Sequence, residues 1–520
     1  MADFKSWDPS SRHLASIAVV IVTFSFLYLR SFLARLRRPP LPPGPRPLPF
    51  VGNIFDMPQV RMWEGLRDLC AKHGAHVVIS MDMVILGSSE VIFELLDRRS
   101  ASTSDRKQTP SIPLMGHDTT FGLMAYGSQW KSHRRAFWQQ FSPTGITKYH
   151  AVLREMTWRF LNTMLRDPVG LEETLQECVA ATMLRTLYGF DAKGRDDRML
   201  SLIWDCIEGT RELLISGGFL MDFFPILRFA PSFLPFHRKL AKWRTANVRF
   251  KDELFARFKA QSKDRNHETY PCMVGEVLAS LSRDGKDEDA LAGAERIAKG
   301  ITLDAVSAGT DTTTSILLTI FFAMSLYPSI QQKAQAELDA VVGPDRLPSF
   351  DDRESLVYLE AIIKEAMRWM PSAPLGLTHC TREDEMINGY FIPAGTVLLA
   401  NIWACLHDSA VYDDPEAFRP ERFLREGKPN PDAQDPGAFS FGFGRRICPG
   451  RHFGLAAVFI YTASALHVFE FLPPLDDHGQ EIRIEPRMAS GFVSRPEDAR
   501  CVFRPRSTRA EVLVVKHAKM

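Results

Sequence analysis

The sequence has few cysteines, and no spacing that would organise them into a metal cage or a disulfide framework. Eight cysteines are scattered over 520 residues, without a Cys-x-x-Cys pair or a cysteine–histidine cluster. Internal repeats, low-complexity tracts and Asn-x-Ser/Thr acceptors are also absent. A charge excess is missing too, since 63 Lys and Arg residues face 62 Asp and Glu residues. These absences exclude a small disulfide-stapled secreted domain and argue against nucleic acid as a partner.

One uncharged apolar run, residues 14–29, lies near the N-terminus. As a helix it would be ~24 Å long, and the residues after Arg30 extend it toward the thickness of a bilayer core. We predict a single transmembrane anchor at 14–34, preceded by a short lumenal tail at 1–13. Four arginines follow the run, which by the positive-inside rule puts the C-terminal bulk in the cytosol. A signal peptide and a buried core helix are the alternatives.

A basic, proline-rich segment at 35–53 follows the predicted anchor. Proline favours an extended backbone, so we expect a semi-rigid hinge, although an SH3-type ligand has a similar composition. From residue 54 to residue 520 helical patterns dominate, with short strand-like pieces near 76–80 and 396–400. The sequence therefore predicts one large domain at 54–520 that is mainly α with a minor β region.

The segment 441–450, with the sequence FGFGRRICPG, is the most informative part of the chain. Its three glycines and one proline forbid a regular helix or strand, so the backbone must fold tightly around Cys448. Loop amides, a neighbouring arginine and the start of the helix that follows all lower the pKa of a thiol. A thiolate placed in this way suits metal ligation, and a buried structural cysteine is the alternative.

This segment resembles the haem-binding loop of the cytochrome P450 family at every fixed position of the pattern Phe-x-x-Gly-x-Arg-x-Cys-x-Gly. The matching residues are Phe441, Gly444, Arg446, Cys448 and Gly450. The resemblance implies the cytochrome P450 fold over 54–520, a haem b cofactor (iron protoporphyrin IX), and Cys448 as the axial thiolate on its iron. It also implies that Arg446 pairs with a haem propionate.

A second segment, 301–322, is predicted to be a long helix whose middle breaks the rules of helix composition. Glycine and β-branched residues are poor in a helix interior, and hydroxyl groups there can bond the carbonyl four residues back. An exposed Ser/Thr-rich turn is the alternative. The family's oxygen-activation motif matches Ala308, Gly309, Asp311 and Thr312. By resemblance, Ala308 and Gly309 lie beside the haem, while Asp311 and Thr312 act in catalysis by delivering protons to dioxygen at the iron.

Three further residues match a structural motif of the family. Glu365 and Arg368 are three residues apart, which places both charges on one helix face, although most such pairs are solvated surface ion pairs. A downstream Pro-Glu-Arg-Phe segment adds Arg422. The resemblance implies that these three residues stabilise the region behind the haem and take no part in the chemistry.

Three more residues match positions that contact the haem propionates in the family. Trp130 and Arg134 fit a Trp-x-x-x-Arg pattern, and His379 fits a position where His or Arg bonds a propionate. An ordinary core or surface histidine is the alternative for His379.

The resemblance implies a membrane-anchored haem-thiolate monooxygenase, similar to fungal microsomal members that tailor secondary metabolites such as terpenoids. Such an enzyme inserts one oxygen atom of O2 into an apolar small molecule, with electrons from NADPH through an NADPH–haemoprotein reductase. The predicted location is the endoplasmic reticulum membrane, with the catalytic domain in the cytosol. A haem-thiolate isomerase or dehydratase that consumes no O2 and a non-catalytic membrane haem-binding protein are the alternatives.

The stretch from Leu213 to Phe236 contains six phenylalanines and only two charged residues. Its prolines and glycines rule out a second membrane span. A plain core segment is one interpretation. The other is an apolar loop that dips into membrane lipid over the substrate entrance, as the corresponding region of microsomal members does.

Overall fold

The computed structural model describes residues 22–23, 26, 39–48, 52–74, 76–79, 83–192, 194, 196–214, 219–262, 271–281 and 288–517. The predicted tail at 1–13 and nearly all of the predicted anchor at 14–34 lie outside the described residues, as does part of the predicted hinge at 35–53. Within the described part, no single helix is long and apolar enough to cross a membrane. The pair α13 and α14 meets that test only together, with a bend of 108° between the two helices.

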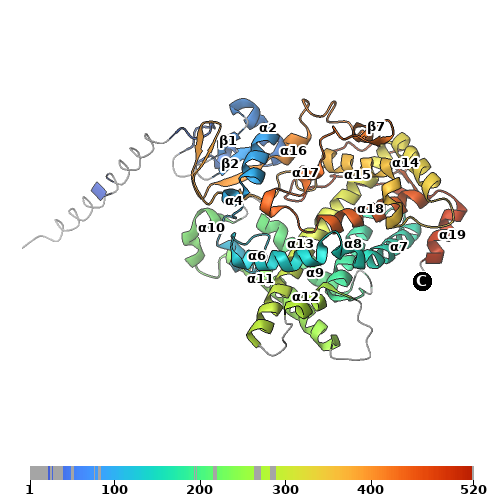
Figure 1. The fold of residues 1–520 in the computed structure, drawn as a ribbon, viewed down its shortest axis with the longest axis horizontal. Helices are drawn as coiled ribbons and strands as arrows, with labels where there is room; N and C mark the ends of the chain where they lie inside the picture. Colours follow the sequence, from blue (N-terminus) through green and yellow to red (C-terminus); the bar gives the residue numbers. More distant parts are fainter. Residues whose placement is uncertain are drawn as a thin grey trace, which may run out of the picture.

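Helices make up most of the structure, which confirms the prediction of a mainly α chain. The longest, α13, runs through the middle of the helical part and contacts α6, α8, α9, α11, α12 and α18 (Figure 1). The α-helices are α2 (Met62–His73), α3 (Ser89–Ile92), α4 (Ser100–Thr103), α5 (Ser111–Leu114), α6 (Ser128–Phe141), α7 (His150–Arg166), α8 (Leu171–Tyr188), α9 (Arg198–Leu214), α10 (Leu220–Phe223), α11 (Pro235–Ser262), α12 (Met273–Leu281), α13 (Glu288–Leu326), α14 (Pro328–Val341), α15 (Val357–Trp369), α16 (Ile402–Leu406), α17 (Gly437–Ser440), α18 (Arg451–Val468) and α19 (Thr508–His517). Short helical turns of other types are η1 (Ile54–Asp56), η2 (Phe93–Arg98), η3 (Gly145–Tyr149), η4 (Pro225–Phe229), η5 (Phe350–Ser355), η6 (Pro420–Phe423) and η7 (Gly444–Arg446).

Several helix boundaries follow from single residues. Pro328 has no N–H to donate, so it cannot continue α13, and it begins α14 instead. Gly189 adopts the left-handed conformation (φ 74°) directly after α8 and ends that helix. The side chain of Asn401 accepts a hydrogen bond from the N–H of Ala404 and caps α16.

Among the described residues, the β part consists of one four-stranded sheet and three two-stranded ones. In the larger sheet the order is β1-β2-β6-β3, with β2 and β6 parallel and the other two pairs antiparallel. This sheet lies on one side of the helical part, and the register pairs His379 of β3 with Leu398 of β6 (Figure 1). The strands are β1 (His76–Ile79), β2 (Met83–Leu86), β3 (His379–Cys380), β4 (Glu385–Ile387), β5 (Tyr390–Ile392), β6 (Val397–Ala400), β7 (Leu424–Arg425), β8 (Lys428–Pro429), β9 (Phe469–Leu472) and β10 (Val502–Pro505).

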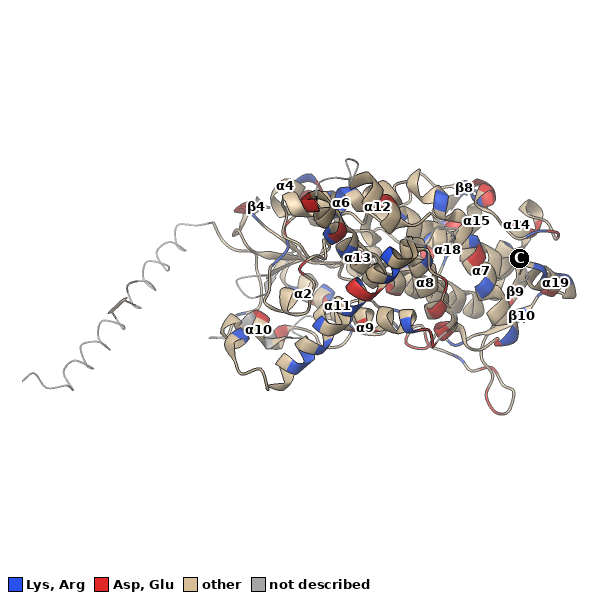
Figure 2. Cartoon of the chain, turned by 90° about the horizontal axis from the view of Figure 1, so that it is seen from below, with Lys and Arg blue, Asp and Glu red and all other residues tan. Residues whose placement is uncertain are grey.

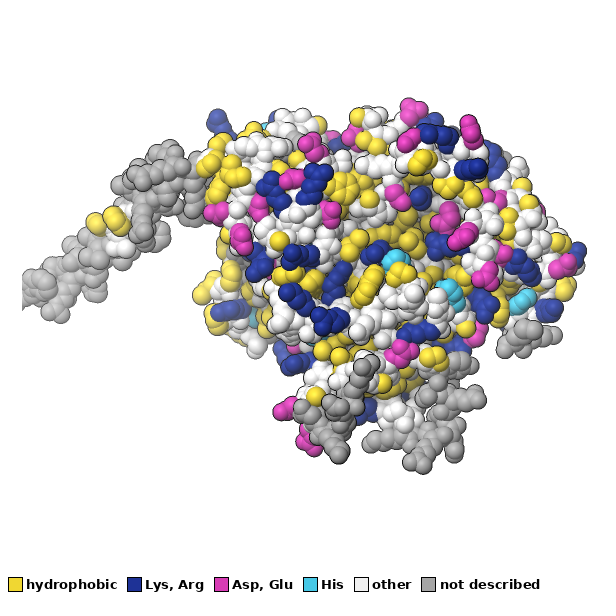
Figure 3. Space-filling model, in the orientation of Figure 1, with side chains coloured by type: hydrophobic (Ala, Val, Ile, Leu, Met, Phe, Trp, Pro, Cys, Tyr) yellow, Lys and Arg dark blue, Asp and Glu magenta, His cyan; other side chains and the backbone are white. Residues whose placement is uncertain are grey.

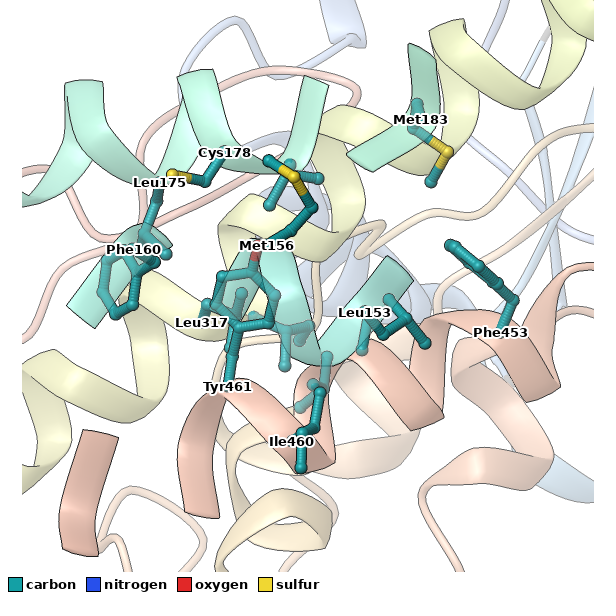
Figure 4. Close-up of a cluster of buried hydrophobic side chains, with 14 of the residues drawn as sticks. Leu153, Met156, Phe160, Leu175, Cys178, Met183, Leu317, Phe453, Ile460 and Tyr461 are labelled. Atoms are coloured by element: carbon teal, nitrogen blue, oxygen red, sulfur yellow. The ribbon is translucent and has the colours of Figure 1, made fainter. Parts of the chain in front are cut away.

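The largest core lies where α7, α8, α13 and α18 meet (Figure 4). Phe160, Leu317 and Tyr461 from three of these helices are fully buried there. Each such side chain stabilises the fold by ~1.5–3 kcal/mol relative to exposure. The hydroxyl groups of Tyr461 and Thr182 lie 3.4 Å apart, so the polar end of the tyrosine has a partner inside the core. This rigid packing supports the two helices that carry the candidate site, α13 and α18.

Candidate active site

The loop around Cys448 folds tightly because two of its glycines adopt the left-handed backbone region. Gly442 has a φ of 73° and Gly444 a φ of 50°. At Gly444 an added Cβ would also lie 2.4 Å from the carbonyl oxygen of Leu96, so no side chain fits there. The N–H of Cys448 donates to the carbonyl of Phe441 at 2.7 Å. This bond closes the loop just before α18 begins.

Cys448 is half-buried, whereas the other seven cysteines are buried. Burial raises the pKa of the Cys448 thiol, while N–H groups of Gly450 and Arg451 and the charges of Arg134 and Arg451 lower it. The net direction is upward. The sequence-based expectation of a lowered pKa is therefore wrong for the polypeptide alone, because desolvation outweighs the loop amides and cations. A metal cation at the sulfur would complete the stabilisation of the thiolate.

Arg446 and Arg134 both lie against the indole ring of Trp130. The guanidinium carbon of Arg446 is 4.5 Å from the ring centroid, and that of Arg134 is 5.5 Å from it. Arg446 donates to the carbonyls of Ser104 at 2.7 Å and Met124 at 2.8 Å. Arg134 donates to the carbonyl of Ile447 at 2.6 Å, beside Cys448. The structure thus brings these three sequence-predicted residues together next to the cysteine loop.

A third arginine, Arg106, joins this cluster, and no sequence pattern pointed to it. Its buried side chain donates to the carbonyls of Gly122 at 3.1 Å and Leu377 at 3.0 Å. Burial and the charge of Arg446 lower the pKa of Arg106 well below its ordinary value. His379 lies beside it with Nδ1 at 3.0 Å from the carbonyl of Thr103, and burial keeps the pKa of its imidazole well below the usual range.

Arg106, Arg134 and Arg446, called the propionate cluster below, fit a ligand that carries two carboxylates. All of their hydrogen bonds in the described part of the chain go to backbone carbonyls, and none goes to a carboxylate. Burial lowers the pKa of Arg446 to about 10. The negative charge of Asp105 opposes this shift, but Asp105 makes no hydrogen bond to the guanidinium. Buried cations without anionic partners are costly, so two propionates beside the thiol of Cys448 would stabilise the cluster.

The middle of α13 presents a small, polar face. Ala308 is exposed although most of the helix around it is buried, and Thr312 one turn later is half-buried. The hydroxyl of Thr312 donates to the carbonyl of Ala308 at 2.8 Å, which is the i−4 bond expected from the sequence. Gly309 is different: an added Cβ there would lie 2.6 Å from the methyl group of Met183. The close approach of Met183 from α8 is one reason for a glycine here, and the predicted place of Gly309 beside the haem stays a prediction.

Asp311 is buried and held by an arginine that the sequence did not reveal. Arg211 of α9 binds it in a bidentate manner, with Nε 2.6 Å from Oδ2 and Nη2 2.7 Å from Oδ1. Arg211 also contacts Glu208 at 3.2 Å on the outer side. The ion pair links α9 to the helix that carries Thr312.

A second buried carboxylate on α13, Asp304, supports the propionate cluster indirectly. It accepts the N–H groups of Phe121 at 2.8 Å and Gly122 at 3.0 Å. The carbonyls of the same two residues accept hydrogen bonds from Arg446 and Arg106. Burial raises the pKa of Asp304 to about 8, against the pull of these two N–H groups.

Glu365, Arg368 and Arg422 form one ion cluster. Arg368 binds Glu365 with two bonds of 2.8 and 2.9 Å, and Arg422 binds it at 3.1 Å. Glu365 and Arg368 are completely buried. Remaining donors of Arg368 reach the carbonyls of Leu406 and Pro415. The arrangement is consistent with structural support and contains no group free to react with a substrate.

Comparison with known proteins covers nearly the whole chain. The family model for cytochrome P450 matches residues 42–503. The chain belongs to the cytochrome P450 family. Members of this family are oxidoreductases that carry a haem and receive electrons from a reductase, which agrees with the thiol and the propionate cluster described above. The family assignment also confirms the predicted cytochrome P450 fold over the described body of the chain.

Curated relatives come from fungi and match along most of their own length. Cytochrome P450 monooxygenase COX2 of Coprinopsis cinerea is 36% identical over 482 residues, covering 91% of this chain and 90% of the relative. Cytochrome P450 monooxygenase 45 of Postia placenta is 32% identical, covering 96% and 94%. Cytochrome P450 monooxygenase ple1 of Rhodocybe pseudopiperita is 34% identical, covering 91% of each chain. This cytochrome P450 is therefore an enzyme of the monooxygenase type.

Proposed function

We propose that this cytochrome P450 inserts one oxygen atom of O2 into an apolar small molecule in fungal secondary metabolism, for example a terpenoid. Electrons would come from NADPH through an NADPH–haemoprotein reductase. The observation that carries the proposal is the thiol of Cys448 on a tight loop, directly beside the propionate cluster. The assignment to secondary metabolism rests on the resemblance to fungal microsomal members and on the fungal origin of the relatives.

The cysteine loop and the propionate cluster would together hold haem b. Cys448 would supply the single protein ligand to the iron, and Phe441, Gly444 and Gly450 would shape the loop that presents it. Arg106, Arg134, Arg446, Trp130 and His379 would surround the two propionates. When bound, the haem supplies the oxidising chemistry and the protein supplies the thiolate, the protons and the orientation of the substrate.

Thr312 and Asp311 would manage protons on the substrate side of the haem. The Thr312 hydroxyl already bonds the Ala308 carbonyl, so a small rotation would let it bond a water or the reacting oxygen. Asp311 is bound by Arg211 of α9, with Arg211 Nε 2.6 Å from its Oδ2. A shift of α9 would free the carboxylate to pass protons inward. Proton delivery would therefore depend on the position of α9.

The substrate would bind against the polar face of α13. The segments 373–375 and 491–493 are the proposed other walls, and hydrogen bonds support their position. Ser315 of α13 bonds the carbonyl of Ser494, whose N–H in turn donates to Ser372 at 2.9 Å. Pro374 accepts a bond from the N–H of Trp403 at 2.9 Å. The bonds through Ser494 join both segments to α13 at Ser315, which supports the proposal that they line the substrate site.

The reductase would dock on a basic face near the cysteine loop. Lys131, Arg382 and Arg445 surround the ring of Tyr126, each between 5.4 and 5.5 Å from its centroid. Arg135 of α6 is exposed beside them. Figure 3 shows Lys and Arg side chains gathered on this face of the molecule. Such a surface would attract an acidic partner and orient it toward the haem loop.

Membrane association would place the enzyme on the endoplasmic reticulum, with the predicted anchor at 14–34 in the bilayer. Support comes from the loop after α10, where Phe224, Ile226, Phe229 and Phe233 are 49%, 73%, 70% and 67% exposed. Phe219 is only 5% exposed and belongs to the core, so the apolar stretch divides into a core part and a surface part. Exposed aromatic side chains of this kind bury in acyl chains.

Substitution of Cys448, the proposed iron ligand, tests the proposal. Cys448→Ser should fold but lose the red-shifted Soret band of the reduced carbon monoxide complex, because an alcohol cannot replace the thiolate. Cys70→Ser, a change at a buried cysteine, should retain that band. A Cys448→Ser protein that keeps the band would contradict the assignment. Reductase-dependent O2 uptake with product formation would separate a monooxygenase from an isomerase and from a non-catalytic haem protein.

A further inference from the structure

The first half of α11 carries positive charge on its solvent face. Between residues 238 and 249 there are five exposed cations and no Asp or Glu. Figure 2 shows this as a series of Lys and Arg segments along α11, starting beside α10. The five residues are Arg238, Lys239, Lys242, Arg244 and Arg249.

A groove of about 380 Å³ lies along this face, between α11 and α9. Arg238, Lys242 and Arg249 line it, with Asp205 of α9 as the single acidic side chain in its wall. The Lys242 ammonium sits 4.0 Å above the ring centroid of the buried Trp243, which fixes its direction. The groove therefore has a net positive lining on a rigid base.

Two of the cations in the groove have no ion-pair partner within the described part of the chain. Arg249 bonds Glu253 at 3.1 Å, and Lys239, just outside the groove, bonds Glu212 at 3.0 Å. Arg238 and Lys242 make no such pair among the described residues. They lie four residues apart on one helix face, so both can reach the same anion.

The exposed apolar loop directly precedes, along the chain, the helix that forms most of the groove. Phe233 precedes the first turn of α11, and Arg238 follows it by five residues. Aromatic side chains that enter acyl chains would hold the adjacent cations at the level of the headgroups. Each cation near an anionic surface contributes about 1 kcal/mol of attraction. A freely dissolved anion would use the cations but not the loop.

We propose that this groove binds the phosphate of an anionic membrane lipid, with Arg238 and Lys242 as its ligands. The inference rests on the proposed membrane association and adds a specific headgroup site to it. Asp205 in the groove wall belongs to α9, the helix that also carries Arg211, the partner of Asp311.

The experiment uses the full-length haem-loaded protein in nanodiscs of phosphatidylcholine, with or without one-fifth phosphatidic acid. Acetylation of Lys242 is measured by mass spectrometry and normalised to Lys428, an exposed lysine of β8. The expected result is at least threefold slower acetylation of Lys242 in the anionic discs, reversed by high salt. Equal rates in the two discs would overturn the proposal.

Variants and a soluble probe separate the sources of protection. Arg238→Gln should remove most of the protection of Lys242, whereas Arg483→Gln, a matched change between β9 and β10, should leave it unchanged. If inorganic phosphate protects Lys242 equally in phosphatidylcholine discs, the site binds free phosphate and the lipid proposal is wrong. The carbon monoxide spectrum of each sample reports the haem-thiolate independently. Loss of this spectrum would contradict the proposed function. An intact spectrum together with a Lys242 acetylation rate that does not depend on anionic lipid would contradict only the proposed lipid site.

Discussion

Two arginine clusters of this chain differ in one respect, which is whether a carboxylate lies among the arginines. In the ion cluster, Glu365 satisfies Arg368 and Arg422 at 2.8–3.2 Å. In the propionate cluster, Arg446 and its neighbours bond only backbone carbonyls, and burial lowers the pKa of Arg446 to about 10. The first cluster contains a carboxylate that both of its arginines bind, whereas the arginines of the second cluster bind no carboxylate among the described residues.

The difference separates a structural role from a binding role. A buried charge with its own partner contributes specificity and rigidity. Removing either member leaves the other as an uncompensated buried charge, which destabilises the fold. A buried cation group without an acid retains its capacity to bind an anionic ligand, at the expense of stability in the protein alone. The same residue type therefore performs two tasks in one domain, and the partner decides which.

The largest effect is expected when the ion cluster loses its carboxylate. Glu365→Ala should lower the free energy of unfolding by about 3–5 kcal/mol and give little haem-loaded protein, because Arg368 and Arg422 remain buried without an acid. Asp432→Ala, which breaks the exposed pair with Arg425, should cost no more than about 1 kcal/mol. Urea unfolding of both variants measures the difference. Equal losses would show that the buried cluster is not structural.

A smaller effect on stability is expected in the propionate cluster. Arg106→Met keeps the volume of the side chain and removes a buried charge, but it leaves backbone carbonyls without a hydrogen-bond donor. The free energy of unfolding should therefore fall by only about 1–2 kcal/mol. Haem release should instead accelerate at least tenfold, measured by transfer to excess apomyoglobin. Arg159→Met, at an arginine that bonds Glu177 on α8, should not accelerate haem release. An unchanged rate of haem release would show that Arg106 does not help to bind the haem.

The finest test concerns Asp304, which positions the loop of the second cluster. Its pKa is about 8 in the folded protein and near 3.8 when unfolded, because burial favours the protonated form. The group therefore stabilises the fold fully below pH 3.8, and this contribution is lost as pH rises through about 8. The loss should reach at most about 1.4 kcal/mol per pH unit. Urea midpoints of Asp304→Asn should fall less steeply with pH than those of the parent, and equal slopes would refute the assignment.

The sequence predicted those features whose signal is local. The Glu365 and Arg368 pair follows from a spacing of three on one helix face, and the position of Cys448 before α18 follows from glycine and proline punctuation. The helix predicted at 301–322 lies inside α13, which extends to Glu288–Leu326 because its ends carry ordinary helix formers. The strands near 76–80 and 396–400 correspond to β1 and β6.

Residues that act across long sequence separations could not be predicted. Arg106 reaches Leu377 over 271 positions, and Arg211 reaches Asp311 over 100 positions. Neither arginine lies in a pattern that distinguishes it from solvated arginines on other helices. Gly309 was assigned to the haem side by resemblance to a family motif, and its close approach to Met183 of α8 is a contact between helices that the motif could not reveal.

Gly444 and Gly450 are both fixed positions of the haem-loop pattern, yet the chain restricts them unequally. Any side chain at 444 would meet the Leu96 carbonyl at 2.4 Å in a left-handed backbone, whereas at 450 a methyl group would lie 3.8 Å from Phe137. A saturation library at the two codons should therefore return only glycine at 444 and a set of small residues at 450 among variants that fold. Engineering of the electronic environment of the sulfur can begin at 450 without dismantling the loop.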